Sequence, residues 1–383
     1  MRVHLLACAA LTALLFSGCG SAPVKVKPSP LPDLPGQSLS ADRVWSVSSG
    51  APVMADLSRL RPAIAGNRVL VAGAKGVLHA LDDAGKTVWE QRTGLPVSGG
   101  LTAGYGRVFA GTAEGDLAAF GVDDGLPVWK KRLSAAILAP AALDAGHVVV
   151  QTQDGRLHVL EAATGNLLWS YDLPMPALSV RGYAMPLIAG DLVIAASAAG
   201  KIVALDLKTG AGRWESQLAT PQGRTEIERL TDIDGDMLLT FDEKLYVGGY
   251  QGQLAAFDLR DRPETVWEYP VSTLQSLAEG LGNVYVAEAD GVLVAVDAAS
   301  GKAVWRQDAL KGRGLSAPAV VAGVLAVGDA EGYIHLFSQA DGKVLGRART
   351  RGAVVSLQVM GERLLVSTDR GVTSSWVLPA VAP

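Results

Sequence analysis

Short apolar runs separated by glycine-containing turns recur along the chain with a period of about 40 residues. Each period contains a unit such as "GRLHVLEAATGNLLW" (155–169), in which alternating apolar positions lead into a turn and then a tryptophan. The alternation predicts a half-buried strand, the turn predicts a hairpin, and the tryptophan closes the next strand. Further copies span 76–89, 115–129, 200–214, 252–267, 291–305 and 332–346, and an eighth begins at 371–378.

Two more short apolar runs precede each unit, as in "SAPAVVAGVLAVGDAEG" (316–332). Four strands in each repeat of this length are typical of a β-propeller blade. The tryptophan is expected to pack between neighbouring blades, because a large ring is buried best between two sheets. The eighth copy stops before its last strand, and the strand around Val44 and Trp45 lacks its own unit. The sequence therefore predicts an all-β, eight-bladed propeller of four-stranded antiparallel blades over residues 43–379, closed by the N-terminal strand.

Composition agrees with many short strands and excludes one class of partner. The chain has 383 residues, of which 49% are hydrophobic and 44 are glycine, whereas aromatic residues make up only 6%. Its net charge is -4. A nucleic-acid-binding protein needs a basic surface, so we expect no nucleic acid partner.

Residues 1–18 have the features of an export signal. Residues 1–18 contain Arg2 and then an apolar run too short to span a bilayer. "FSGC" resembles a bacterial lipobox, which predicts a lipidated Cys19; an ordinary signal cut nearby, with Cys19 incidental, is the alternative. The only other cysteine is Cys8, inside the signal. Residues 19–42 are rich in proline and are expected to form an extended tether, so the membrane is reached through the lipid anchor only.

The repeat lengthens at two adjacent places. The spacing is 45 residues from Trp169 to Trp214 and 53 from Trp214 to Trp267, whereas the other tryptophan intervals are 38 to 44. Both extensions follow a tryptophan strand, and in a four-stranded meander all such connections emerge on one face of the ring. The first contains "LSVRG" (178–182) and the second "GRTEIERLTDID" (223–234). Long loops on a rigid scaffold often carry function.

These two loops are expected to lie side by side, with Arg181 facing Asp232 and Asp234. Leu178 and Val180 add apolar surface beside the arginine, and a mixed surface of this kind suits a protein partner better than a small substrate. Two alternatives stay open, because the second loop could be a solvated insertion and an exposed ion pair could only order the loops. Glu226, Glu228 and Arg229 have no assigned role.

The sequence contains no recognisable set of catalytic, metal-binding or phosphate-binding residues. His79, His158 and His335 occupy the same slot in three repeats, so the ring separates them and they are interpreted as packing residues. The glycine-rich turns are hairpins, and none opens a helix to hold a phosphate. The repeats resemble those of quinoprotein dehydrogenases, which implies a periplasmic enzyme with pyrroloquinoline quinone as the alternative function. Those enzymes carry an adjacent-cysteine pair that this chain lacks, so we expect no enzyme, cofactor, metal or small-molecule substrate.

Together, the lipobox, the tether, the eight repeats, "LSVRGYAMP" and "GRTEIERLTDID" resemble the BamB family of outer-membrane β-barrel assembly lipoproteins. The resemblance implies a scaffold on the periplasmic face of the outer membrane that binds the POTRA domains of BamA, with other Bam subunits nearby. The family's Leu-x-Leu-Arg loop and aspartate pair correspond here to Leu178, Val180 and Arg181, then Asp232 and Asp234.

Two consequences of this resemblance remain hypotheses. Val180 stands where the family has leucine, which affects the strength of an apolar contact and not its identity. Nascent outer-membrane proteins could also pair with the outer strands by β-augmentation. An envelope-binding module with another partner is a third possibility, besides the scaffold and the quinoprotein.

Overall fold

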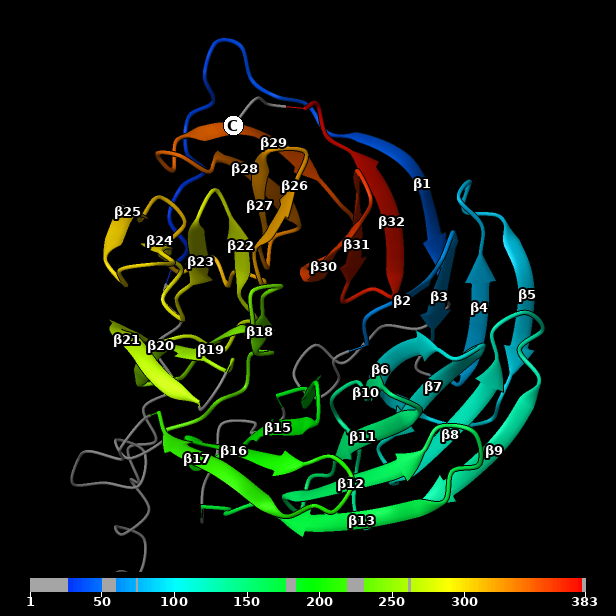
Figure 1. Ribbon diagram of the computed structural model, residues 1–383. Coiled ribbons are helices and arrows are strands. Elements are labelled where there is room, and N and C mark those ends of the chain that lie inside the picture. The colour runs from blue at the N-terminus through cyan, green and yellow to red at the C-terminus, as the bar shows by residue number, and fades with distance from the viewer. Residues whose placement is uncertain are drawn as a thin grey trace, which may run out of the picture.

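The computed structural model describes residues 27–49, 60–73, 75–176, 184–218, 231–260 and 263–380. In this part of the chain, strands form eight four-stranded sheets, each antiparallel, arranged as blades around a central axis (Figure 1). The eight-bladed propeller predicted from the repeats is confirmed. The described residues contain no helix long and apolar enough to cross a membrane.

Blades are numbered in chain order, and the first strand of each lies innermost. The strands of blades 1 to 4 are β2 (Ala63–Ala65), β3 (Arg68–Ala72), β4 (Val77–Leu81), β5 (Thr87–Arg92); β6 (Val97–Gly104), β7 (Arg107–Thr112), β8 (Asp116–Gly121), β9 (Pro127–Arg132); β10 (Ala142–Asp144), β11 (His147–Gln151), β12 (Arg156–Glu161), β13 (Leu167–Asp172); β14 (Leu187–Ala189), β15 (Leu192–Ala196), β16 (Lys201–Asp206) and β17 (Gly212–Gln217).

Blades 5 to 8 repeat the same plan, except that the last strand of blade 8 comes from the other end of the chain. Their strands are β18 (Leu238–Leu239), β19 (Lys244–Gly248), β20 (Gly252–Asp258), β21 (Glu264–Val271); β22 (Ala278–Gly280), β23 (Asn283–Ala287), β24 (Leu293–Asp297), β25 (Ala303–Gln307); β26 (Ala319–Val321), β27 (Val324–Gly328), β28 (Tyr333–Ser338), β29 (Val344–Arg349); β30 (Val354–Met360), β31 (Arg363–Thr368), β32 (Val372–Val377) and β1 (Asp42–Ser48).

Blade 8 closes the ring as the sequence predicted. β1 pairs antiparallel with β32, from Asp42 opposite Val377 to Ser48 opposite Val372. The N-terminal strand therefore covers an edge that would otherwise expose a row of unpaired backbone groups. In Figure 1 the blue β1 lies beside the red β32.

Burial of the third strands corrects one expectation. We expected the alternating strand of each repeat to be half-buried, but β12 buries His158 and its neighbours on both faces, with Leu157, Val159 and Leu160 fully covered. Each blade lies between two other blades, so both faces of its middle strands contribute to hydrophobic clusters. The alternation is clearest on outermost strands such as β13.

The tryptophans join neighbouring blades, which confirms their predicted role. Trp129 of blade 2 donates from Nε1 to the backbone oxygen of Ala162 in blade 3, at 3.1 Å. Its ring lies 2.7 Å from where a β-carbon on Gly165 would sit, and Gly165 has φ of +74°. Glycine is required there by both conformation and space. The same indole bond reaches the next blade from Trp45, Trp89, Trp169, Trp267 and Trp305.

Blade 7 lacks this tryptophan because the N-terminal segment occupies its place. Gly346 stands at the equivalent position of β29, and a β-carbon there would lie 2.1 Å from the backbone oxygen of Leu39. Leu39 donates its amide to Leu345, at 2.7 Å, and forms an isolated parallel bridge with Gly346. Its side chain packs on the cluster that joins blades 7 and 8.

Candidate functional site: the loop face

One face of the ring, here called the loop face, carries the connections from the outermost strand of one blade to the innermost strand of the next. The two extended connections run from β13 to β14 and from β17 to β18, so both emerge on this face. They leave the neighbouring blades 3 and 4 (Figure 1). Their middle parts, 177–183 and 219–230, lie outside the described residues. That range includes six residues named above: Leu178, Val180, Arg181, Glu226, Glu228 and Arg229.

Asp232 and Asp234 lie at the base of the second extension and are both completely buried. The Tyr250 amide donates to the backbone oxygen of Asp232 at 2.7 Å, which ties this base to β19 and β20. Ile233, between the two aspartates, belongs to the core between blades 4 and 5. The two carboxylates can therefore act on a partner only through residues that they position.

Asp236 continues the alternation and makes a contact across the ring. Its Oδ2 lies 2.5 Å from Nη1 of Arg61, and its Oδ1 accepts the Met185 amide at 3.1 Å. Arg61 immediately precedes blade 1, which faces blade 5 across the axis (Figure 1). This ion pair is largely shielded, with side-chain exposures of 26% for Arg61 and 13% for Asp236. It connects opposite sides of the propeller on the loop face.

A close approach to blade 6 fixes the same segment from another side. A β-carbon on Gly235 would lie 2.2 Å from the backbone oxygen of Gln275, so only glycine fits there. The Asp236 amide donates to Ser276 Oγ at 3.0 Å. Segment 231–237 is thus held by contacts from blades 1, 4, 5 and 6.

Sequence reasoning missed Asp236 and Arg61 for different reasons. Asp236 is the third aspartate of "DIDGD" (232–236), so the alternation could have revealed it. Arg61 is 175 residues away from Asp236 in sequence. Only the closure of the ring brings it to blade 5.

A cavity of about 630 Å³ lies beside this ion pair, lined by the segments that lead into six of the blades. Its wall is mixed, with Met185, Leu315 and Leu357 next to Arg61, Asp236 and Gln358. The size falls within the range of ligand pockets. No group of three or more histidine, cysteine or acidic residues is placed to hold a metal among the residues with described positions.

The repeated histidines have hydrogen bonds as well as packing contacts. His335 Nε2 lies 2.9 Å from Asp329 Oδ2, and His158 Nε2 lies 3.1 Å from Ser134 Oγ. Burial lowers the pKa of His158, which favours the neutral ring. Its Nδ1 faces the Ser170 hydroxyl at 3.5 Å, where a catalytic triad would place a carboxylate. The geometry at His158 is therefore that of a structural contact.

Comparison with known proteins identifies the family. A family model described as outer membrane protein assembly factor BamB matches residues 38–120, 74–291 and 289–376. The chain belongs to the BamB family. The BamB of Pseudomonas aeruginosa is 40% identical to it over 95% of this chain and 96% of its own length. The BamB of Burkholderia pseudomallei is 33% identical, with 95% of each chain covered.

Solved structures agree with the fold. BamB from Moraxella catarrhalis superposes with a TM-score of 0.81 at 30% identity, covering 88% of this chain and all of that one. The quinohemoprotein alcohol dehydrogenase of Comamonas testosteroni superposes with a TM-score of 0.71 at only 14% identity, covering 91% of this chain and 77% of the enzyme. At that identity the likeness establishes a shared propeller fold and no shared chemistry.

Proposed function

We propose that the chain is a non-catalytic scaffold of the outer-membrane protein assembly machinery, lipid-anchored through Cys19 on the periplasmic face of the outer membrane. Membership of the BamB family supports this role, because the curated relatives are named as assembly factors. The proposed partners are the POTRA domains of BamA and other Bam subunits. Nascent outer-membrane proteins are a further proposed contact.

The loop face is the proposed docking surface. Leu178 and Val180 bury apolar area against the partner, and Arg181 makes charge-assisted hydrogen bonds to it. Asp232 and Asp234 act from beneath, since both are buried. Their proposed role is to position the loops and not to touch the partner.

The main support for this proposal is that segment 231–237, at the base of the second loop, is held by contacts from four blades. Segment 231–237 combines buried aspartates, the obligatory Gly235 and the Arg61 ion pair across the ring. A solvated insertion would not need such an anchored base. A binding loop does, because a preorganised surface loses less conformational freedom when the partner binds.

The proposal is tested by Arg181→Glu and co-purification with BamA. We expect this substitution to lower the amount of BamA recovered at least tenfold, since reversing a central charge leaves the partner's group unpaired. Lys208→Glu is the matched control, because Lys208 is exposed on a turn of blade 4 at the opposite face and the charge change is the same. Equal recovery with both variants would contradict the docking surface.

Enzymatic function is tested separately. The alternative of a quinoprotein predicts dye reduction by the purified protein after addition of pyrroloquinoline quinone and calcium. We expect no activity above that of the free cofactor. Turnover that depends on the protein would replace the scaffold by an enzyme.

A further inference from the structure

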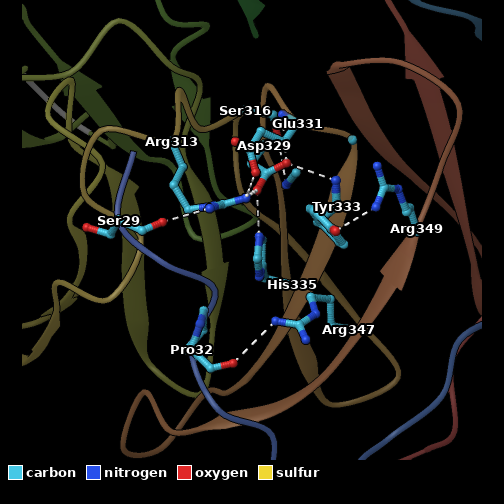
Figure 2. Close-up of polar contacts among 12 residues, drawn as sticks. Ser29, Pro32, Arg313, Ser316, Asp329, Glu331, Tyr333, His335, Arg347 and Arg349 are labelled. Atoms are coloured by element: carbon cyan, nitrogen blue, oxygen red, sulfur yellow. Dashed lines mark hydrogen bonds and ion pairs between the residues drawn. The ribbon is translucent and has the colours of Figure 1, made fainter. Parts of the chain in front are cut away.

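The N-terminal segment is docked on blade 7 before it enters β1. The Ser29 amide donates to the Lys311 oxygen at 2.9 Å, and Arg313 Nη1 donates to the Ser29 oxygen at 2.8 Å. Arg347 of β29 donates to the Pro32 oxygen at 3.2 Å (Figure 2). With Leu39 against Gly346, the segment is held at several points along its length.

Arg313, which binds the Ser29 oxygen, is held in place by two ion pairs. Its side chain is 2% exposed and lies 2.8 Å from Asp329 and 2.5 Å from Glu331 (Figure 2). Burial works to raise the pKa of Asp329, but hydrogen bonds from His335, the Tyr333 amide and Arg313 outweigh it and hold this pKa below its usual value. The carboxylate therefore stays charged at neutral pH.

Docking at Ser29 limits how far the propeller can lie from a lipid on Cys19. Ser29 is ten positions after Cys19, and a chain of that length reaches at most about 35 Å when fully extended. A tether free up to Asp42 would reach about 80 Å. A lipid attached to Cys19 would thus keep blade 7 close to the membrane surface.

The side of blade 7 beside this dock is basic. Residues 344–352 contain Arg347, Arg349 and Arg351 and no acidic residue, in a chain whose net charge is -4, whereas Lys343 just before them is paired with Asp341 at 2.6 Å. Arg349 and Arg351 are exposed. Arg347 and Arg349 both lie over the Tyr333 ring, at 5.5 and 4.8 Å from its centre. None of the three arginines forms an ion pair with a carboxylate of the described residues.

The equivalent strand of blade 2 offers a contrast. β9 also carries three cations in its second half, Lys130, Lys131 and Arg132. There Asp116 lies 3.0 Å from Arg132 and 3.9 Å from Lys130, and Glu114 lies 3.8 Å from Arg132. The charge of β9 is therefore largely compensated within the protein, whereas that of Arg347, Arg349 and Arg351 is not.

We propose that Arg347, Arg349 and Arg351, with Tyr333 beneath the first two, bind the phosphate-bearing headgroups of an anionic membrane surface. Arginine suits this role because its guanidinium can hold phosphate oxygens through two parallel hydrogen bonds. Tyrosine is favoured at the same depth of the bilayer because its ring is apolar and its hydroxyl polar. This inference rests on the proposed lipid anchor, which places the three arginines within reach of the bilayer.

Flotation with lipid vesicles tests the inference without depending on acylation. The mature chain with Cys19→Ser, which retains the propeller and the docked segment, is mixed with vesicles of phosphatidylglycerol and phosphatidylcholine or of phosphatidylcholine alone. We expect binding to the anionic vesicles only, and its loss in 0.5 M salt, a value chosen because the Debye length is then only about 4 Å. Replacing all three arginines by glutamine is expected to lower the partition about 100-fold, at roughly fivefold per charge.

Matched variants decide the interpretation. The triple glutamine variant of Lys130, Lys131 and Arg132 removes the same charge from β9, and we expect less than a threefold effect. Replacing Arg347, Arg349 and Arg351 by lysine keeps the charge but removes the paired guanidinium bonds, so we expect binding weaker than that of wild type and stronger than that of the glutamine variant. Arg349→Gln with Arg351→Gln spares the Arg347 bond to Pro32 should the triple variant fold poorly. Equal losses from the glutamine variant on β9 and the glutamine variant of Arg347, Arg349 and Arg351, or equal binding to both vesicle types, would overturn the proposal. Absence of acylation on Cys19 in cells, measured by mass spectrometry, would instead count against the proposed anchor.

Discussion

Two kinds of junction between blades hold this ring together, and they use different chemistry. At the junction of blades 2 and 3, Trp129 packs over Gly165 and donates to the Ala162 oxygen of the next blade's turn. At the junction of blades 7 and 8, Gly346 replaces the tryptophan and Leu39 of the N-terminal segment covers it.

The difference follows from how the ring closes. The indole needs a turn between the third and fourth strands of the next blade as its acceptor. Blade 8 has no such turn, because its third strand ends at Val377 and its fourth begins at Asp42. A tryptophan at 346 would lack its partner, so the chain that leads into β1 fills the space. The exception in the repeat is a consequence of closure.

The tryptophan junction is expected to be the more costly to break. Trp129→Ala removes the indole bond, the contact with Gly165 and a tilted ring contact with Phe109 at 5.8 Å. We expect a loss of about 3–5 kcal/mol in the free energy of unfolding, which is usual for removal of a packed aromatic side chain. Urea unfolding followed by circular dichroism measures it. A loss below 1 kcal/mol in the free energy of unfolding would show that this junction does not depend on Trp129.

The next largest effect is expected from Asp329, the buried aspartate that pairs with Arg313 where the N-terminal segment contacts blade 7. Asp329→Asn leaves Arg313 with Glu331 alone and is expected to lower the free energy of unfolding by about 3 kcal/mol at pH 7. The pKa of Asp329 is depressed in the folded protein, so its contribution is complete above about pH 4 and is lost as the pH falls through the folded pKa.

The pH dependence separates this effect from simple loss of packing. The stability difference between wild type and Asp329→Asn is expected to start shrinking below about pH 4, where the carboxyl of the unfolded chain takes up a proton, and to vanish as the pH falls through the lower folded pKa. Unfolding measured in urea at a series of acidic pH values follows it. A difference that stays constant down to pH 2 would exclude the charge as its cause.

Placing a tryptophan at position 346, as in the other repeats, is expected to destabilise the junction between blades 7 and 8. Gly346→Trp follows the pattern of the other blades but forces the side chain into the Leu39 backbone, at a cost of about 1–3 kcal/mol. Hydrogen exchange of the Leu39 amide, which donates to Leu345, is expected to become faster than in wild type. A stabilised variant with a protected Leu39 would contradict our explanation of the missing tryptophan.

The smallest expected effect provides the matched control. Gly212 lies on outermost strand β17 of blade 4, and a β-carbon there would meet nothing within 4 Å. Gly212→Ala is expected to stabilise the protein by about 0.5 kcal/mol, because alanine restricts the unfolded chain. Gly346→Ala, by contrast, is expected to destabilise it. Thermal melts of the two alanine variants compare the positions directly.

The repeat made most of the fold predictable. The number of blades, their four strands, the packing role of the tryptophans and closure by β1 followed from the period and from the incomplete last copy. The third strands proved buried on both faces, because alternation of residues within one strand does not report a second neighbouring blade. The docking of residues 29–39 was also missed, since backbone oxygens such as that of Ser29 accept hydrogen bonds whatever the side chain.

The candidate site was predictable in its position but not in its construction. Unequal spacing of the tryptophans placed two long connections on one face, as the strand order confirms. The burial of Asp232 and Asp234 depends on packing between blades 4 and 5, which charge alone could not reveal. Arg61 reaches Asp236 only because blades 1 and 5 face each other across the axis.

Photo-crosslinking in cells at position 181 tests the central claim, that the loop face binds the assembly machinery, most directly. A photoreactive residue in place of Arg181 is predicted to form an adduct with BamA, whereas the same residue in place of Lys208, on the opposite face, is predicted to form none. Adducts of equal yield at both positions, or no adduct at 181 when the protein is present at wild-type level, would contradict the account.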